Sequence, residues 1–154
     1  DSKNMHPAYL KTQFRTQESV ELWPQEFVIV TAYATTGTQW PPEQNEAADR
    51  RLESELRGRS GWLVRLTGFS PSTGHAEPGW AFEMPFEEAC DLGLRYLQDA
   101  LYHVAGDALS VSFCDDRRKL VPVDSFRERL HFKLSGSPFD KLRANGTSGF
   151  EDSV

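Results

Sequence analysis

The sequence has few cysteines. There are two, Cys90 and Cys114, and neither belongs to a C-x-x-C pair or stands at metal-finger spacing from a histidine. A zinc finger is therefore excluded, and we expect two buried, reduced thiols in a cytoplasmic protein. Two aspartates follow Cys114 directly. Such acidic neighbours raise the pKa of a thiol, which argues against a cysteine nucleophile at this position.

Positive charge is outnumbered by negative charge, with 17 Lys and Arg against 23 Asp and Glu, and long apolar runs are missing. The 154 residues carry a formal net charge of -6, which argues against duplex DNA or an anionic membrane as a partner. No apolar run reaches membrane-spanning length, and nothing resembles a signal peptide. We therefore expect a protein that neither spans a membrane nor binds duplex DNA.

The common catalytic motifs are missing as well. The stretch 36–38 has neither the pattern nor the lysine of a phosphate-binding loop, and no Gly-x-Ser-x-Gly elbow occurs. The strand motif with which RNA-recognition modules stack bases is also lacking. The sequence thus predicts no cofactor and none of the common hydrolase or nucleotide-binding chemistries.

What is present is a regular alternation of strand and helix patterns. Residues 27–34 are a continuous apolar run rich in β-branched residues, which is typical of a central strand buried on both faces. A helix over 43–56 is predicted by the recurrence of Ala48, Leu52 and Leu56 every four residues. A second helix is predicted from Pro85 onward, and further strands at 62–69, 80–84, 100–104 and 108–114.

This order of elements predicts the fold class. Strand, helix, strand, strand, helix, strand is the split βαβ pattern of a ferredoxin-like α/β sandwich. We therefore expect an α+β fold with a mixed or antiparallel sheet, two helices on one face and the other face open. Residues 9–23 predict an additional N-terminal hairpin or edge strand, and residues 120–123 predict a further strand of a C-terminal meander.

A single α/β domain is predicted over residues 27–123. Residues 1–26 are an N-terminal extension with the edge strand or hairpin, and residues 124–154 a mostly irregular or disordered tail. The stretch 137–146 resembles a peptide at the ends of many unrelated bacterial reading frames, translated from a repeated intergenic element. That origin implies a tail segment without a function.

Four segments follow one another in an informative order and spacing. They are residues 27–32 (FVIVTA), 43–45, 77–78 (EP) and 96–101 (YLQDAL). Together they resemble a small bacterial family known as domain of unknown function 3293. The chain departs from the family pattern at 34–35, where Ala-Thr replaces Asn-Pro, and at Gly79, which replaces a serine. The resemblance implies the fold and a bacterial origin, and it implies no activity.

The residues that match the family pattern are the candidate site: Thr31, Asn45, Glu77 and Gln98. In a split βαβ sandwich the third strand begins at the sheet end where the second helix finishes, so Glu77 and Gln98 are expected to approach each other. Asn45, at the start of the first helix, is expected at the opposite end. A competing interpretation, which we favour, is structural: Glu77 and Gln98 brace loops or helix ends, and Asn45 forms a hydrogen bond in the first turn of its helix.

A metal site is a weaker alternative. His75 and Glu77 alternate along the chain and, with His103 or Asp107, include the residue types that ligate metals. Their spacing matches no metal signature, so no metal is predicted.

Two functions remain open. The first is a non-enzymatic protein-interaction or regulatory module, which presents its open sheet face or an edge strand to another protein or a second copy of itself. The second is a small enzyme or small-ligand binder with Glu77 as polar anchor and Gln98 as the group that orients it. The lack of a catalytic set favours the first, and a cavity lined jointly by Thr31, Glu77 and Gln98 would favour the second.

Overall fold

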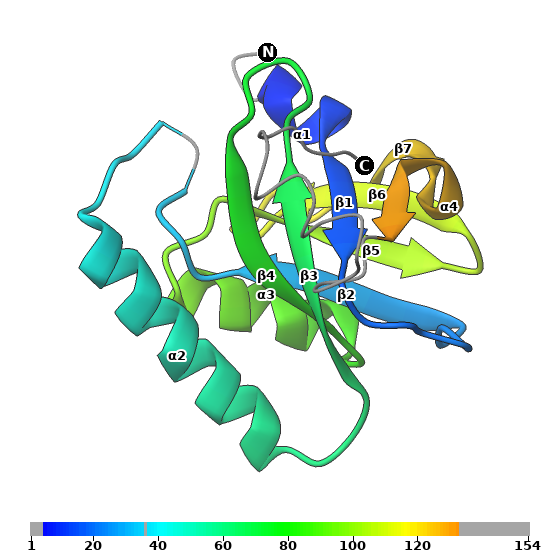
Figure 1. The fold of residues 1–154 in the computed structure, drawn as a ribbon, viewed down its shortest axis with the longest axis horizontal. Helices are drawn as coiled ribbons and strands as arrows, with labels where there is room; N and C mark the ends of the chain where they lie inside the picture. The colour runs from blue at the N-terminus through cyan, green and yellow to red at the C-terminus, as the bar shows by residue number, and fades with distance from the viewer. Residues whose placement is uncertain (1–4, 36, 133–154) are drawn as a thin grey trace, which may run out of the picture.

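The computed structural model describes residues 5–35 and 37–132 (Figure 1). This part of the chain contains four helices and eight strands. The helices are α1 (Pro7–Lys11), α2 (Pro42–Gly58), α3 (Phe86–Arg95) and α4 (Phe126–Arg129). The strands are β1 (Gln13–Thr16), β2 (Glu26–Thr31), β3 (Leu63–Phe69), β4 (Ala76–Phe82), β5 (Ala100–Ala105), β6 (Ala108–Phe113), β7 (Val121–Ser125) and β8 (Leu130–Phe132).

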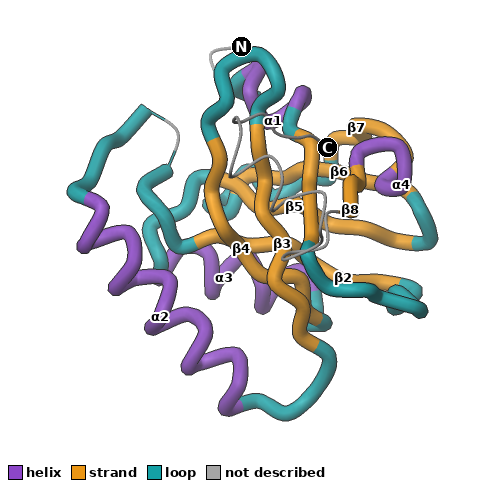
Figure 2. The backbone as a smooth tube through the Cα atoms, viewed as in Figure 1, coloured by secondary structure: helices purple, strands orange, loops and turns teal. Residues whose placement is uncertain are grey.

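These strands form one sheet in the order β7-β6-β5-β2-β4-β3-β1-β8. Neighbours run antiparallel, except β1 and β8, which are parallel. The sheet curls until the short helix α4 connects its two edge strands, β7 and β8 (Figure 2). The predicted α+β class with a mixed, mostly antiparallel sheet is confirmed.

Strand β2 is central because it is apolar on both faces. It pairs with β4 on one side and with β5 on the other. Val28 and Val30 belong to one hydrophobic core, whereas Phe27 and Ile29 belong to a second core. Successive strand side chains point to opposite faces, so a continuous apolar run supplies both cores at once. The predicted central strand is confirmed.

Helices α2 and α3 contribute to the same core, on one side of the sheet (Figure 1). The predicted stripe Ala48, Leu52 and Leu56 is buried in it, together with Ala89 and Leu92 of α3. A proline precedes each helix at the N-cap, Pro41 and Pro85. Burial of these apolar stripes is the main source of helix stability in a protein of this kind.

The opposite face of the sheet is not open. A second core fills it, with Phe14, Phe27, Leu66, Leu109 and Phe126 as large buried members. Aromatic rings contribute much of this core: Trp23, Phe27, Trp62 and Phe126 lie with centroids 5.2–5.5 Å apart in several pairs. The expectation of an open sheet face is therefore wrong, because residues outside the central strands supply aromatic groups that cover it.

The N-terminal segment forms a helix and a strand instead of a hairpin. Pro7 opens α1, and the ring of His6 accepts a hydrogen bond from the N–H of Ala8. Strand β1 lies between β3 and β8, and Phe14 in it is 1% exposed. The predicted strand exists, but the predicted hairpin and edge position are wrong, because β8 pairs with its outer side.

Residues 124–132, expected to begin an irregular tail, are structured. The hydroxyl of Ser125 caps α4 by accepting from the N–H of Glu128, and Phe126 is 3% exposed. One buried aromatic side chain thus anchors a segment whose composition is mainly polar. The stretch 137–146, with its resemblance to an intergenic peptide, lies outside the described residues.

Strand β4 begins earlier than predicted, so that Glu77 and Pro78 lie within it. Its pairing with β3 starts at Ala76, whereas its pairing with β2 extends only to Gly79. Proline is rare inside strands, so the sequence pattern did not predict a strand there. Pro78 is tolerated because β4 has only one neighbouring strand at this point.

Within the described ranges no helix has the length and apolar character needed to cross a membrane.

Candidate ligand-binding pocket

Thr31, Glu77 and Gln98 come from three elements that meet at one end of the sheet. Thr31 is the last residue of β2, Glu77 lies at the start of β4, and Gln98 precedes β5. Because β4 and β5 both run antiparallel to β2, their beginnings lie beside its end. All three residues line the same pocket.

Asn45 lies at this end of the sheet too, so the expectation of the opposite end is wrong. Helix α2 follows β2 in the chain, and its first turns therefore lie near the end of β2. The side-chain oxygen of Asn45 accepts the backbone N–H of Ala34 at 2.8 Å. Asn45 is not among the residues that line the pocket. It braces the loop after β2, which is a structural role.

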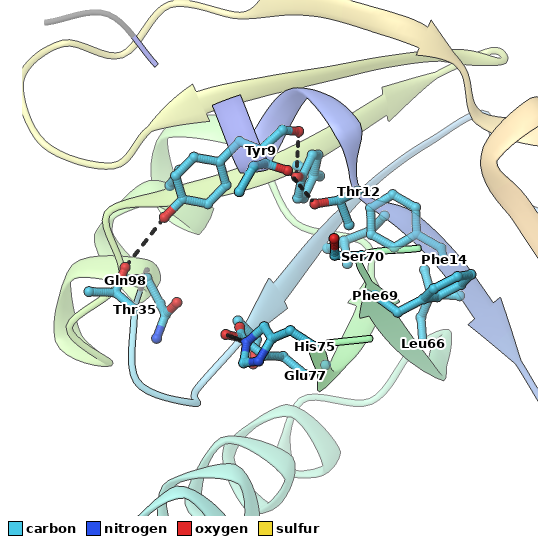
Figure 3. Close-up of a pocket in the computed structure, with 17 residues that line it drawn as sticks. Tyr9, Thr12, Phe14, Thr35, Leu66, Phe69, Ser70, His75, Glu77 and Gln98 are labelled. Carbon is cyan, nitrogen blue, oxygen red and sulfur yellow. Dashed lines mark hydrogen bonds and ion pairs between the residues drawn. The ribbon is translucent and has the colours of Figure 1, made fainter. Parts of the chain in front are cut away.

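The pocket has a volume of about 120 Å³ and lies between the curled sheet and the segment of helix α1. Its walls are mainly apolar, with the rings of Tyr9, Phe14, Phe69 and Tyr102 and the side chains of Ile29 and Leu66. In Figure 3 Tyr9 and Gln98 lie on one side, Phe14 and Phe69 on the other, and the His75–Glu77 pair between them. The volume is close to that of a cavity of about 150 Å³ that binds benzene, so a small organic group fits.

Gln98 is buried, and only the nitrogen of its side-chain amide has hydrogen-bond partners among the described residues. Its side-chain nitrogen donates to the carbonyl oxygens of Tyr33 at 2.7 Å and Tyr96 at 3.1 Å. Because both partners can only accept, the orientation of the amide is fixed, and no described residue donates to Oε1. Gln98 is 5% exposed. A buried acceptor without a partner costs about 1–3 kcal/mol, so Oε1 calls for a donor from outside the protein.

Glu77 likewise has a partner among the described residues for only one of its two carboxylate oxygens. Its Oε2 lies 2.8 Å from Nε2 of His75, whose side chain is 69% exposed, whereas that of Glu77 is 22% exposed. No described residue donates to Oε1 of Glu77. The imidazole therefore covers one carboxylate oxygen on the solvent side and leaves the other available.

Three of the hydroxyl groups that line the pocket, those of Thr12, Thr31 and Tyr102, already donate to backbone carbonyl oxygens. Thr31 donates to the carbonyl oxygen of Pro78 at 2.8 Å, and Thr12 donates to that of Ala8 at 2.8 Å. Tyr102 donates to the carbonyl oxygen of Tyr9 at 2.6 Å, and burial raises the pKa of Tyr102, so it remains the donor. These three hydroxyls therefore have no proton left to donate to a ligand.

The N-terminal segment closes the pocket, which the sequence analysis did not predict. Tyr9 and Thr12 line it together with Tyr102, and Tyr9 also contacts the hydroxyl of Thr35 at 3.4 Å. The β-prone residues of the stretch 9–23 predict a hairpin or edge strand, which does not place Tyr9 and Thr12 over a pocket. Pro7 after His6 was the available signal, since a proline in the first turn is typical of a helix start.

The alternative metal ligands are separated in the structure. His75 pairs with Glu77, whereas His103 contacts Glu26 at 2.7 Å and Asp107 accepts from the N–H of Arg127. Among residues 5–35 and 37–132, no three His, Cys, Asp or Glu side chains form a group suited to a metal ion.

Cys90 and Cys114 are free thiols, and both are buried. A hydrogen bond with Cys90 raises the pKa of Cys114, burial adds to this, and Asp115 makes a smaller contribution. The predicted direction is right, but the neighbouring thiol is its main cause rather than the acidic loop. A Cβ on Gly93 would lie 2.6 Å from the Cys114 sulfur, so this thiol is tightly packed against α3.

A partly buried ion pair between helix α2 and strand β3 was not anticipated. Asp49, 6% exposed, accepts hydrogen bonds from both terminal nitrogens of Arg65, at 2.8 and 2.6 Å, and from the indole N–H of Trp80 at 3.1 Å. The Arg65 guanidinium lies 4.1 Å from the centroid of the Trp80 ring. The signal in the sequence was an aspartate beside Ala48 on an apolar helix face. These residues do not line the pocket.

Residues 30–101 match the model of a family described as "Protein of unknown function (DUF3293)". The match includes Thr31, Asn45, Glu77 and Gln98, and it confirms the resemblance predicted from the four sequence segments. No curated protein and no solved structure matches the chain.

Proposed function

We propose that this protein, a member of the DUF3293 family by its residues 30–101, is a small-molecule-binding module. The ligand occupies the pocket at the end of β2, with Glu77 and Gln98 as its polar anchors. This is the second of the two functions left open by the sequence, and it needs no catalytic residue.

One observation carries the proposal: a carboxylate and a buried amide line one mainly apolar pocket, and one oxygen of each accepts no hydrogen bond from residues 5–35 or 37–132. Binding sites for small molecules are typically apolar clefts with a few convergent polar groups. If Glu77 and Gln98 served only as loop braces, both ends of each group would be expected to have protein partners.

The interaction-module hypothesis has less support. The second hydrophobic core occupies the sheet face that was to receive a partner. A protein partner or a second copy at an edge strand stays a prediction, since β7 and β8 lie at the sheet edges.

The strand order β5-β2-β4-β3, with its antiparallel pairings, supports the ferredoxin-like interpretation of the central strands. A bacterial origin and a cytoplasmic location likewise remain part of the proposal. The two free, buried thiols are consistent with a reducing compartment.

The proposal is tested by an NMR screen of small organic fragments against ¹⁵N-labelled protein. Binding in the pocket is expected to shift the amide signals of Thr31, Gly68, Gly79 and Gln98 together. Shifts confined to residues away from this end of the sheet, or no shifts with any fragment, would contradict it.

A pocket-narrowing variant separates binding in the pocket from binding elsewhere. A Cβ on Gly68 would lie 3.3 Å from Cγ2 of Thr12 and 3.7 Å from Cε1 of Phe14, both of which are pocket residues. Gly68→Val is therefore expected to weaken fragment binding at least about tenfold, by analogy with overpacking of a core. The control is Gly58→Val, since a Cβ on Gly58 meets no atom within 4 Å.

A further inference from the structure

One carboxylate oxygen and one amide oxygen of the pocket residues accept no hydrogen bond from the described part of the chain. They are Oε1 of Glu77 and Oε1 of Gln98, and in each residue the other polar atom is engaged, with His75 or with backbone carbonyls. The hydroxyls of Thr12, Thr31 and Tyr102 already donate to backbone carbonyls. A ligand that satisfies these two oxygens must bring hydrogen-bond donors.

The charge of the residues that line the pocket indicates which kind of hydrogen-bond donor a ligand would bring. Glu77 supplies a carboxylate, and the pocket residues within the described ranges include neither lysine nor arginine. The nearby arginines are engaged elsewhere: Arg129 donates to the carbonyl oxygen of Thr12 and to Asp124, and Arg15 lies over the ring of Phe69. The one histidine among the described lining residues, His75, is already paired with Glu77 at 2.8 Å. An anion would therefore meet the Glu77 carboxylate with no other basic side chain in the described lining, whereas a cationic N–H donor would pair with its second oxygen.

The apolar walls are also compatible with a cation. Rings of Tyr9, Phe14, Phe69 and Tyr102 line the pocket, and aromatic faces attract ammonium groups. A metal ion is a poorer candidate, because no group of three suitable ligands occurs in the described part of the chain. An organic cation satisfies both the two acceptors and the apolar walls.

We propose that the pocket selects small organic amines, whose ammonium group donates to Oε1 of Glu77 and Oε1 of Gln98 while an alkyl or aryl body contacts the aromatic walls. This rests on the proposed function, since it names the ligand class of the same pocket.

The test compares three probes of similar size and different charge: benzylamine, benzyl alcohol and benzoate. Each is titrated into the full chain at pH 7, and dissociation constants are taken from the amide shifts of the pocket residues. Benzylamine is expected to bind at least about tenfold more tightly than benzyl alcohol, as a charge-assisted hydrogen bond is roughly twice as strong as a neutral one. Benzoate is expected to bind more weakly than either.

Glu77→Gln removes the charge and keeps the size of the side chain. It is expected to weaken the binding of benzylamine about tenfold and to change the affinity for benzyl alcohol less than about twofold. The two affinities should therefore become similar. Glu83→Gln is the matched control, because Glu83 is exposed and does not line the pocket. It is expected to leave both affinities unchanged. The comparison of probes on the unaltered protein decides the matter even if Glu77→Gln fails to fold.

The failures of the two proposals are distinguishable. If benzyl alcohol or benzoate binds in the pocket as tightly as benzylamine, the proposed selection of amines is wrong, but the proposed small-molecule pocket is still supported. Equal weakening of benzylamine by Glu77→Gln and Glu83→Gln also overturns the role of Glu77. If none of the probes and no other fragment shifts the pocket residues, both proposals are wrong.

Discussion

The side-chain nitrogen of Gln98 donates to the carbonyl oxygen of Tyr33 at 2.7 Å, and this bond joins the segment after α3 to the loop after β2. The same nitrogen donates to Tyr96. One buried amide thus holds two segments in place and directs its oxygen away from both, so the structural and the proposed binding roles of Gln98 belong to different atoms.

Gln98→Glu separates these roles. It places a carboxylate against the carbonyl oxygens of Tyr33 and Tyr96, and we expect a loss of about 2–4 kcal/mol in the free energy of unfolding at pH 7. Burial beside two acceptors raises the pKa of the new carboxyl group in the folded state. Stability is therefore retained at low pH, where the group is protonated, and is lost as the pH rises through that pKa.

Urea denaturation at pH 4 and pH 7 measures the effect of Gln98→Glu. Gln44→Glu, on the exposed first turn of α2, is the control, and its added charge is favourable there. The difference between the two variants should shrink at pH 4. An unchanged difference would show that the amide does not donate to these carbonyls.

Asp49→Ala is expected to lower the free energy of unfolding by about 1–3 kcal/mol. The substitution removes the acceptor of the Trp80 indole and leaves Arg65, whose side chain is 37% exposed, to turn partly toward water. Asp91→Ala is the comparison, because Asp91 is 69% exposed and its partner Arg118 keeps Glu87. A change of less than about 0.5 kcal/mol is expected there. Similar losses for both variants in thermal denaturation would refute a special role for Asp49.

Leu97→Gly is expected to stabilise the protein by up to about 1 kcal/mol. Leu97 has φ of 60° and follows α3, a position that glycine usually occupies because it lacks a Cβ. Its side chain is exposed, so little packing is lost. Leu94→Gly, inside the last turn of α3, should instead destabilise by about 1 kcal/mol. Chemical denaturation of both variants checks the opposite signs, and a destabilised Leu97→Gly would contradict the argument.

Glu55→Gln should remove part of the stability at neutral pH. Hydrogen bonds from Arg95 and Tyr96 lower the pKa of Glu55 in the folded state, with that from Arg95 the larger cause. Its contribution is therefore present above the ordinary glutamate pKa of about 4.3 and disappears as the pH falls through the lowered value. The effect is a few tenths to about 1 kcal/mol at pH 7, because the pair is partly exposed.

Denaturation of the wild type and Glu55→Gln at pH 7 and pH 3 gives the comparison, with Glu83→Gln as the control. The two proteins should differ at pH 7 and converge at pH 3. A difference that grows toward acid would have the wrong sign for this account.

The central elements were predictable because their patterns are local. The apolar run of β2 and the four-residue recurrence of Ala48, Leu52 and Leu56 follow directly from period and burial. The start of β4 was not predictable in this way, because Pro78 and Gly79 are unusual in a strand and the pairing with β3 alone makes them tolerable.

The pocket was predictable only in part. Thr31, Glu77 and Gln98 were identified from the segments they share with a family, and strand order brings them to one end. Tyr9 and Tyr102 could not be added, because their contact joins segments far apart in the chain through a backbone carbonyl. The position of Asn45 was available from topology alone, since a helix that follows a strand begins at the end of that strand.

A crystal structure of the full chain soaked with benzylamine tests the central claim most directly. The account predicts one molecule in the pocket, with its nitrogen within about 3.2 Å of Oε1 of Glu77 and Oε1 of Gln98 and its ring against the aromatic walls. Benzylamine bound only elsewhere, or Oε1 of Gln98 satisfied by a donor of the protein itself, would contradict it.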